Sequence, residues 1–202
     1  MHKVGLVDFG TLGNTQSIRE AFRYVGADVH LLTDSEQFKQ VDSIVIPGVG
    51  SFNHGMSRLS EKPNFLPELK RAINSKPTLG ICLGMQLMAK VGFENQKTVG
   101  IDIFNAEVRL MENVSVVPHM GFNKVIVQRD TELLAGLDGA EFYFMHSYEV
   151  VNYTDVMSLS SYDNHEFVSS VCRGNIFGVQ FHPEKSRDPG LQLFENFLKL
   201  GN

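Results

Sequence analysis

The chain lacks tryptophan and contains only two cysteines, Cys82 and Cys172, among its 202 residues. Two cysteines are too few for a disulfide framework, so we expect a reducing, cytoplasmic location. An excess of positive charge is also missing: the formal net charge is −5, which disfavours nucleic acid and anionic membrane surfaces as partners. No apolar run approaches the length of a membrane span. The first eight residues reach Asp8 after a short apolar stretch, so we expect no signal peptide.

The apolar residues that are present suffice for a sizeable core. Hydrophobic residues make up 43% of the chain and include 15 phenylalanines, a composition that excludes intrinsic disorder, collagen and coiled coils. No repeat, low-complexity segment or linker divides the sequence. The length and continuity therefore predict a single domain over residues 1–202.

Strand-like and helix-like segments alternate in the N-terminal half. Strands are predicted over 4–7, 29–32, 43–46 and 77–81, and helices over 17–25, 66–74 and 83–91. From residue 106 onward, short strands are predicted over 108–110, 124–127, 142–145, 156–161, 168–172 and 176–180, before a closing helix over 191–200. The pattern predicts an α/β fold: an open, mostly parallel central sheet with flanking helices and a smaller antiparallel sheet. Ligands of such sheets bind beyond the carboxyl ends of the strands.

The sharpest chemical signal is the segment Gly80-Ile81-Cys82-Leu83-Gly84 between a predicted strand and a predicted helix. This is the nucleophile-elbow pattern with cysteine in place of serine. Glycines on both sides remove side chains that would crowd the turn, and the helix N-terminus favours negative charge on the sulfur. A buried structural cysteine between two packing glycines is the alternative reading.

A cysteine nucleophile needs a base, and His182 is the best candidate among seven histidines. It follows the strand predicted over 176–180, and Glu184 lies two residues further on. In extended backbone these two side chains share a face, so Glu184 could orient the imidazole as in a catalytic triad. A histidine–glutamate pair in a surface turn is the alternative.

The loop Pro47-Gly48-Val49-Gly50 also follows a predicted strand. Its glycines would allow backbone N–H groups to approach an anion, so the loop could complete an oxyanion hole beside the elbow. It lacks the Lys and Ser/Thr of a phosphate-binding P-loop. His119, His146 and His182 have no partner at metal-ligand spacing, so we predict no metal and no cofactor.

Five segments along the whole chain carry a family resemblance. They are Pro47–Phe52 (PGVGSF), Leu79–Gln86 (LGICLGMQ), Val117–Asn123 (VPHMGFN), Tyr143–Tyr148 (YFMHSY) and Gly178–Ser186 (GVQFHPEKS). With these segments the chain resembles the triad (class I) glutamine amidotransferases. Within them it is most similar to the glutaminase subunits of imidazole glycerol phosphate synthase, an enzyme of histidine biosynthesis.

The resemblance implies roles for individual residues. Cys82 would be the nucleophile, His182 the general base and acid, and Glu184 the residue that orients His182. The oxyanion hole would comprise backbone N–H groups of Leu83 and of the Val49-Gly50 segment. Glutamine would be bound by Gln86, Glu94, Ser147 and Tyr148. A partner-facing surface would contain Phe122, Asn123, Tyr143, His146 and Lys185.

The same resemblance implies a heterodimer with a separate (β/α)₈-barrel synthase subunit, to which ammonia from glutamine would pass. Two positions depart from the family pattern: the loop from Asp8 to Asn14 is one residue longer, and Phe122 replaces a tryptophan. Both are expected at the partner-facing surface. A paralogous glutaminase that feeds another synthase, such as a sugar-aminating enzyme of surface polysaccharide biosynthesis, is therefore an alternative.

Two further alternatives belong to other classes. A stand-alone hydrolase such as a γ-glutamyl peptidase would not need the partner surface implied by the segments around His119 and His146. A catalytically silent binding module would not need an intact triad of Cys82, His182 and Glu184.

Overall fold

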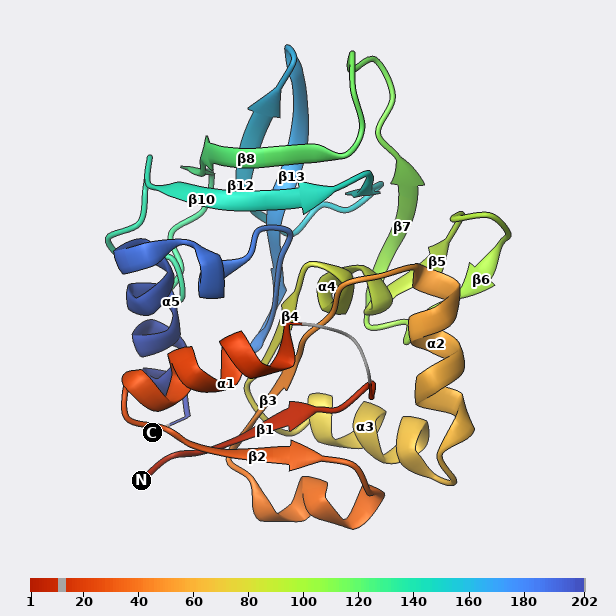
Figure 1. The fold of residues 1–202 in the computed structure, drawn as a ribbon, viewed down its shortest axis with the longest axis vertical. Helices are drawn as coiled ribbons and strands as arrows, with labels where there is room; N and C mark the ends of the chain where they lie inside the picture. Colours follow the sequence, from red (N-terminus) through yellow and green to blue (C-terminus); the bar gives the residue numbers. More distant parts are fainter. Residues whose placement is uncertain (11–13, 202) are drawn as a thin grey trace.

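An eight-stranded sheet runs through the computed structural model, which describes residues 1–10 and 14–201 (Figure 1). The strand order is β2-β1-β3-β4-β14-β13-β12-β9. Five neighbouring strands are parallel: β2 (Asp28–Leu32), β1 (Lys3–Val7), β3 (Ser43–Ile46), β4 (Thr78–Ile81) and β14 (Ile176–Val179). The sheet continues in antiparallel fashion through β13 (His165–Arg173), β12 (Val156–Tyr162) and β9 (Ile126–Val127). The predicted open, mostly parallel sheet is thus confirmed.

Helices cover both faces of this sheet (Figure 1). One face packs against α1 (Thr15–Tyr24) and α5 (Arg187–Lys199), and the other against α2 (Phe52–Glu61), α3 (Phe65–Ile73) and α4 (Leu83–Leu87). Two short 3₁₀ helices, η1 (Ser35–Gln40) and η2 (Pro183–Lys185), complete the helical elements of the described residues. Within residues 1–10 and 14–201, no helix is both long enough and apolar enough to cross a membrane.

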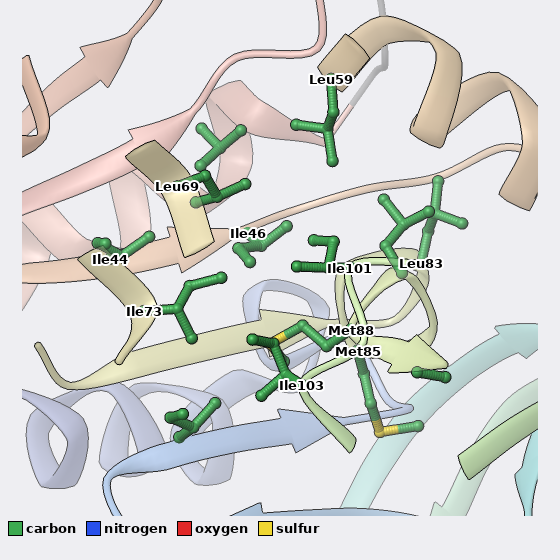
Figure 2. Packing of buried hydrophobic residues seen from close by; sticks show 14 of the residues in the cluster. Ile44, Ile46, Leu59, Leu69, Ile73, Leu83, Met85, Met88, Ile101 and Ile103 are labelled. Atoms are coloured by element: carbon green, nitrogen blue, oxygen red, sulfur yellow. The ribbon is translucent and has the colours of Figure 1, made fainter. Parts of the chain in front are cut away.

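The alternation of side chains along β3 explains why both faces need cover. Ile44 and Ile46 belong to the core under α2 and α3, whereas Val45 belongs to the core under α1 and α5. Figure 2 shows Ile44 and Ile46 packed with Leu69 and other apolar side chains of the first core. A strand that is buried on both faces reads as the continuous apolar run seen in the sequence.

Two smaller sheets flank the carboxyl ends of the parallel strands. The predicted antiparallel sheet consists of β8 (His119–Lys124) and β10 (Glu141–His146). A four-stranded mixed sheet, which the sequence did not predict, contains β11 (Tyr148–Val151), β7 (Phe104–Leu110), β5 (Ala89–Gly92) and β6 (Thr98–Val99).

The predicted helix over 83–91 is wrong in its second half, because α4 ends at Leu87 and strand β5 begins at Ala89. The carbonyl oxygen of Leu87 accepts a hydrogen bond from Ile101 N at 2.7 Å, and that of Met88 accepts from Phe104 N at 2.9 Å. These carbonyl oxygens are unavailable for a longer helix, because they already accept hydrogen bonds from Ile101 and Phe104.

Other boundaries also shifted. The strand predicted over 124–127 is divided between the end of β8 and β9, with Val125 between them. Helix α2 was not predicted, and α5 begins four residues before the predicted start at 191. Both differences lie at polar or glycine-containing stretches, where local periodicity is weak.

Candidate active site

The candidate site lies where three adjacent parallel strands end. Because β3, β4 and β14 are neighbours, the loop after Ile46, the elbow after Ile81 and the segment after Val179 meet at one edge of the sheet. Ligands bind at this edge in open α/β folds. The sheet order thus brings together three segments that are far apart in sequence.

Cys82 occupies the predicted elbow between β4 and α4 in a backbone conformation with φ 50° and ψ −107°. A positive φ is strained for a non-glycine residue and is typical of nucleophile elbows. A Cβ atom at Gly84 would lie 1.8 Å from the carbonyl oxygen of Ile46, and one at Gly80 would lie 2.8 Å from Gly84 C. Both glycines therefore permit close backbone approach, as the sequence indicated.

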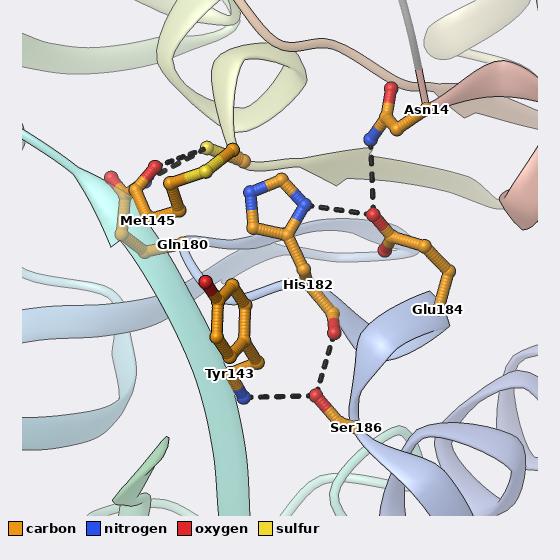
Figure 3. Close-up of polar contacts among 8 residues, drawn as sticks. Asn14, Tyr143, Met145, Gln180, His182, Glu184 and Ser186 are labelled. Carbon is orange, nitrogen blue, oxygen red and sulfur yellow. Dashed lines mark hydrogen bonds and ion pairs between the residues drawn. The ribbon is translucent and has the colours of Figure 1, made fainter. Parts of the chain in front are cut away.

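His182 and Glu184 form a fully buried pair, with Nδ1 and Oε1 2.8 Å apart (Figure 3). Burial lowers the pKa of His182, but the charge of Cys82 and the hydrogen bond and charge of Glu184 outweigh burial and raise the pKa to about 10. Among the residues described, His182 Nε2 has no hydrogen-bond partner. With Nδ1–H donating to Glu184, Nε2 is the ring nitrogen that faces the nucleophile as a base.

Strand β10 fixes the backbone of His182 in place. His182 N donates to the Tyr143 carbonyl at 2.8 Å, and Tyr143 N donates to Ser186 Oγ at 3.0 Å (Figure 3). Ser186 Oγ in turn donates to the His182 carbonyl at 2.6 Å. The smaller antiparallel sheet thus anchors the histidine of the candidate triad.

A cavity of about 190 Å³ opens beside Cys82. Its lining contains the eight residues predicted as nucleophile, oxyanion hole or substrate site: Val49, Gly50, Cys82, Leu83, Gln86, Glu94, Ser147 and Tyr148. Pro118, Met145 and His146 complete the lining. The structure therefore brings the predicted nucleophile, oxyanion and substrate residues to one pocket.

Glu94 has a structural contact as well as a place in this lining. Its carboxylate accepts a hydrogen bond from Phe52 N at 2.7 Å, at the start of α2. A carboxylate at a helix N-terminus is stabilised by the helix dipole. Glu94 thus ties α2 to the pocket while remaining part of the pocket wall.

The residues expected on a partner-facing surface differ in their exposure. Phe122 and Lys185 are exposed, and Asn123 and Tyr143 are half-buried. His146 is buried and does not contribute an exposed side chain, which corrects that expectation. Its position on β10 turns it inward, where Nε2 lies 3.3 Å from His119 Nδ1.

Burial lowers the pKa of His119, and it lowers the pKa of His146 to about 3. The two imidazoles are therefore neutral near pH 7 and pack as aromatic rings with Phe144 and Phe167.

Sequence reasoning assigned no role to Gln180 or Asn14. Asn14 Nδ2 donates to Glu184 Oε1 at 3.2 Å, and Gln180 Nε2 lies 3.5 Å from Cys82 Sγ (Figure 3). The signals for Gln180 were its place two residues before His182 and within the segment Gly178–Ser186 that carries the family resemblance. The extra residue of the first loop falls at 11–13, outside the described residues.

The chain belongs to the class I glutamine amidotransferases, since the family model "Glutamine amidotransferase class-I" matches residues 5–200. Among individual relatives, the imidazole glycerol phosphate synthase subunit HisH of Pyrococcus furiosus is 40% identical over 99% of this chain and 100% of that protein. The same-named subunit of Caldanaerobacter subterraneus is 36% identical over 98% of each chain.

Solved structures support the fold. A putative GMP synthase protein from Thermoplasma acidophilum matches with a TM-score of 0.76 and 23% identity, covering 100% of this chain and 94% of that chain. A glutamine amidotransferase crystal structure matches with a TM-score of 0.77 and 18% identity, covering 98% of each chain.

Proposed function

We propose that the chain is the glutaminase subunit of an imidazole glycerol phosphate synthase and supplies ammonia for histidine biosynthesis. The observation that carries the proposal is the buried His182–Glu184 pair beside the elbow cysteine, at a cavity lined by Gln86 and Glu94. Full-length similarity to relatives named as HisH subunits supports this assignment over a sugar-aminating paralogue.

The proposed reaction begins at Cys82. His182 Nε2 takes the thiol proton, and the sulfur attacks the side-chain amide carbon of glutamine. Collapse of the tetrahedral intermediate breaks the C–N bond, and His182 returns the proton to the leaving nitrogen as ammonia forms. Water then hydrolyses the glutamyl thioester to glutamate, with His182 acting again as base. Glu184 holds the imidazole in the required tautomer throughout.

Backbone N–H groups would stabilise the oxyanion of this intermediate. Leu83 N–H lies in the first turn of α4, where N–H groups have no acceptor within the helix. The Val49-Gly50 segment lines the same cavity from the end of β3. Gln86 and Glu94 lie further along the wall, where they would bind the amino-acid end of glutamine.

An apolar surface next to the site supports a barrel partner. Val117, Met120 and Phe122 expose 40%, 59% and 45% of their areas, an unusual concentration of large apolar side chains around β8. Lys185 lies over the Tyr143 ring, so basic and aromatic groups adjoin each other here. We propose that a (β/α)₈-barrel synthase subunit docks on this surface and receives ammonia that would otherwise be protonated in water.

We further propose that residues 1–202 act as one glutaminase domain in the cytoplasm. The family match over 5–200 supports a single unit, and the free, buried state of Cys82 and Cys172 fits a reducing compartment.

The test is glutamate release from glutamine by the purified chain, alone and with the source organism's synthase barrel plus the nucleotide ligand of that barrel. We expect a large rise in rate with the barrel and complete loss in Cys82→Ala. Cys172→Ala is the matched control, because it removes the other buried thiol and leaves the pocket intact. Slow release that the barrel does not change would reject the histidine pathway and direct the search to sugar-aminating synthases.

A further inference from the structure

Gln180 places a completely buried amide beside the candidate nucleophile. Its side chain is 0% exposed, and its backbone follows β14 with Gln180 N donating to the Ser169 carbonyl at 2.9 Å. A buried amide is costly unless its polar atoms are hydrogen-bonded. The partners of this amide therefore indicate why a glutamine occupies the position.

The orientation of the Gln180 amide follows from its neighbours. Gln86 Nε2 donates to the Tyr148 carbonyl at 2.9 Å and to Gln180 Oε1 at 3.0 Å. Both N–H groups of Gln86 are thus occupied, and the oxygen of Gln180 must face Gln86. The Gln180 NH₂ group then points at Cys82 Sγ, 3.5 Å away. A flipped amide would set two NH₂ groups against each other.

Besides His182, which interacts with Cys82 through charge, two neighbours of the sulfur favour different protonation states. As a thiol, Cys82 can donate its proton to the Met145 carbonyl oxygen, which lies 3.9 Å away. As a thiolate it has no proton to donate, and an N–H donor becomes the favourable partner because hydrogen bonds to charged acceptors are the stronger ones. Gln180 is such a donor, held in place before the proton leaves.

We propose that Gln180 is a positioning residue that aims and stabilises the Cys82 thiolate through an N–H···S hydrogen bond, with Gln86 fixing its amide. This inference rests on the proposed role of Cys82 as nucleophile. It also links the cavity wall to the nucleophile, because Gln86 lines the cavity and donates a hydrogen bond to Gln180. The series Tyr148 carbonyl, Gln86, Gln180 and Cys82 is a continuous chain of polar contacts.

Two substitutions separate the hydrogen bond from the size of the side chain. Gln180→Met keeps an unbranched side chain of similar length and removes the donor. Gln180→Glu keeps the shape and an oxygen for Gln86, but turns a carboxylate towards the sulfur. Asn196→Met is the matched control, since Asn196 is another buried amide, bonded to the Leu133 and Ala135 carbonyls and to no pocket residue.

The measurement is the rate of iodoacetamide alkylation of Cys82 against pH, followed by peptide mass spectrometry so that Cys172 is scored separately. In both Gln180 variants we expect the pH of half-maximal alkylation to rise by about one unit. We expect kcat for glutamine hydrolysis to fall about tenfold or more, with KM changed less. Asn196→Met should lower thermal stability and leave the alkylation profile unchanged.

A wild-type alkylation profile in the Gln180 variants would overturn the inference, as would an equal shift in Asn196→Met. If Gln180→Met does not fold, the alkylation profile of the size-matched Gln180→Glu variant tests the proposal. Alkylation does not require turnover, so this result is independent of the proposed function. That function fails separately if Cys82→Ala still releases glutamate.

Discussion

Gly84→Ala should destabilise the protein strongly, although the same substitution usually stabilises a helix. Gly84 lies in α4, directly beneath the end of β3. An added Cβ atom would lie 1.8 Å from the carbonyl oxygen of Ile46 and 3.2 Å from that of Pro47. Both contacts are with backbone, so no side-chain rotation relieves them. Helix α4 or the end of β3 must move until the added Cβ lies more than 3.0 Å from the Ile46 carbonyl oxygen.

The magnitude follows from two opposing effects. Replacing a helical glycine by alanine gains about 1 kcal/mol from helix propensity. Forcing apart two buried backbone segments costs about 3 kcal/mol or more, at the upper end of overpacking effects. In a chain of this size, 1 kcal/mol corresponds to about 2–4 °C in Tm. We therefore expect Tm to fall by about 4 °C or more, with loss of glutaminase activity because the elbow is displaced.

Gly55→Ala is the control for this experiment. Gly55 also lies in a helix, α2, but its added Cβ would meet the methyl groups of Leu87 at 3.0 and 3.1 Å, which a side chain can accommodate. Thermal unfolding followed by circular dichroism should give a Gly55→Ala protein within a few degrees of wild type. If Gly84→Ala melts at the same temperature as Gly55→Ala, the backbone contact does not constrain the elbow and the reasoning is wrong.

Three further predictions concern the charge, the pH response and the surface of the site. Glu184→Gln removes the charge that helps raise the pKa of His182, so glutamate release should fall about a hundredfold or more, and an unchanged rate would exclude Glu184 as the orienting group. Burial lowers the pKa of His146 to about 3, whereas its pKa in the unfolded chain is about 6.5. The contribution of the neutral, buried His146 imidazole to stability is therefore complete above that pH and is lost as the pH falls towards 3. Urea titrations should show about 2 kcal/mol less stability from His146 at about pH 5 than at about pH 7, and His146→Gln should lose less than wild type; equal losses would contradict the assignment. Phe122→Ala should weaken binding to the proposed synthase barrel about tenfold in calorimetry, while glutamine hydrolysis by the free chain is unchanged. An unaltered Kd would show that the proposed docking surface does not include Phe122.

Local sequence determined the chemistry of the site because each of its parts depends on near neighbours. A strand, a cysteine between two glycines and a helix define the elbow at Cys82, since the turn needs small residues within two positions. His182 and Glu184 are likewise two residues apart, and the predicted contact between them is present. The extended backbone expected for this segment was wrong, because Glu184 lies in the 3₁₀ helix η2, for which His182 is the N-cap. Apolar runs and periodicity predicted the parallel strands for the same reason.

The tertiary structure decided which distant segments meet. Helix α4 ends early because residues beyond 100 capture the carbonyls of Leu87 and Met88, and no local propensity records that competition. His146 turns inward because β10 pairs with β8 and presents alternate side chains to the core. The contact of Gln180 with Cys82 joins residues 98 positions apart. It exists because β4 and β14 pair in parallel, and sheet order is set by the packing of the whole chain rather than by neighbours in sequence.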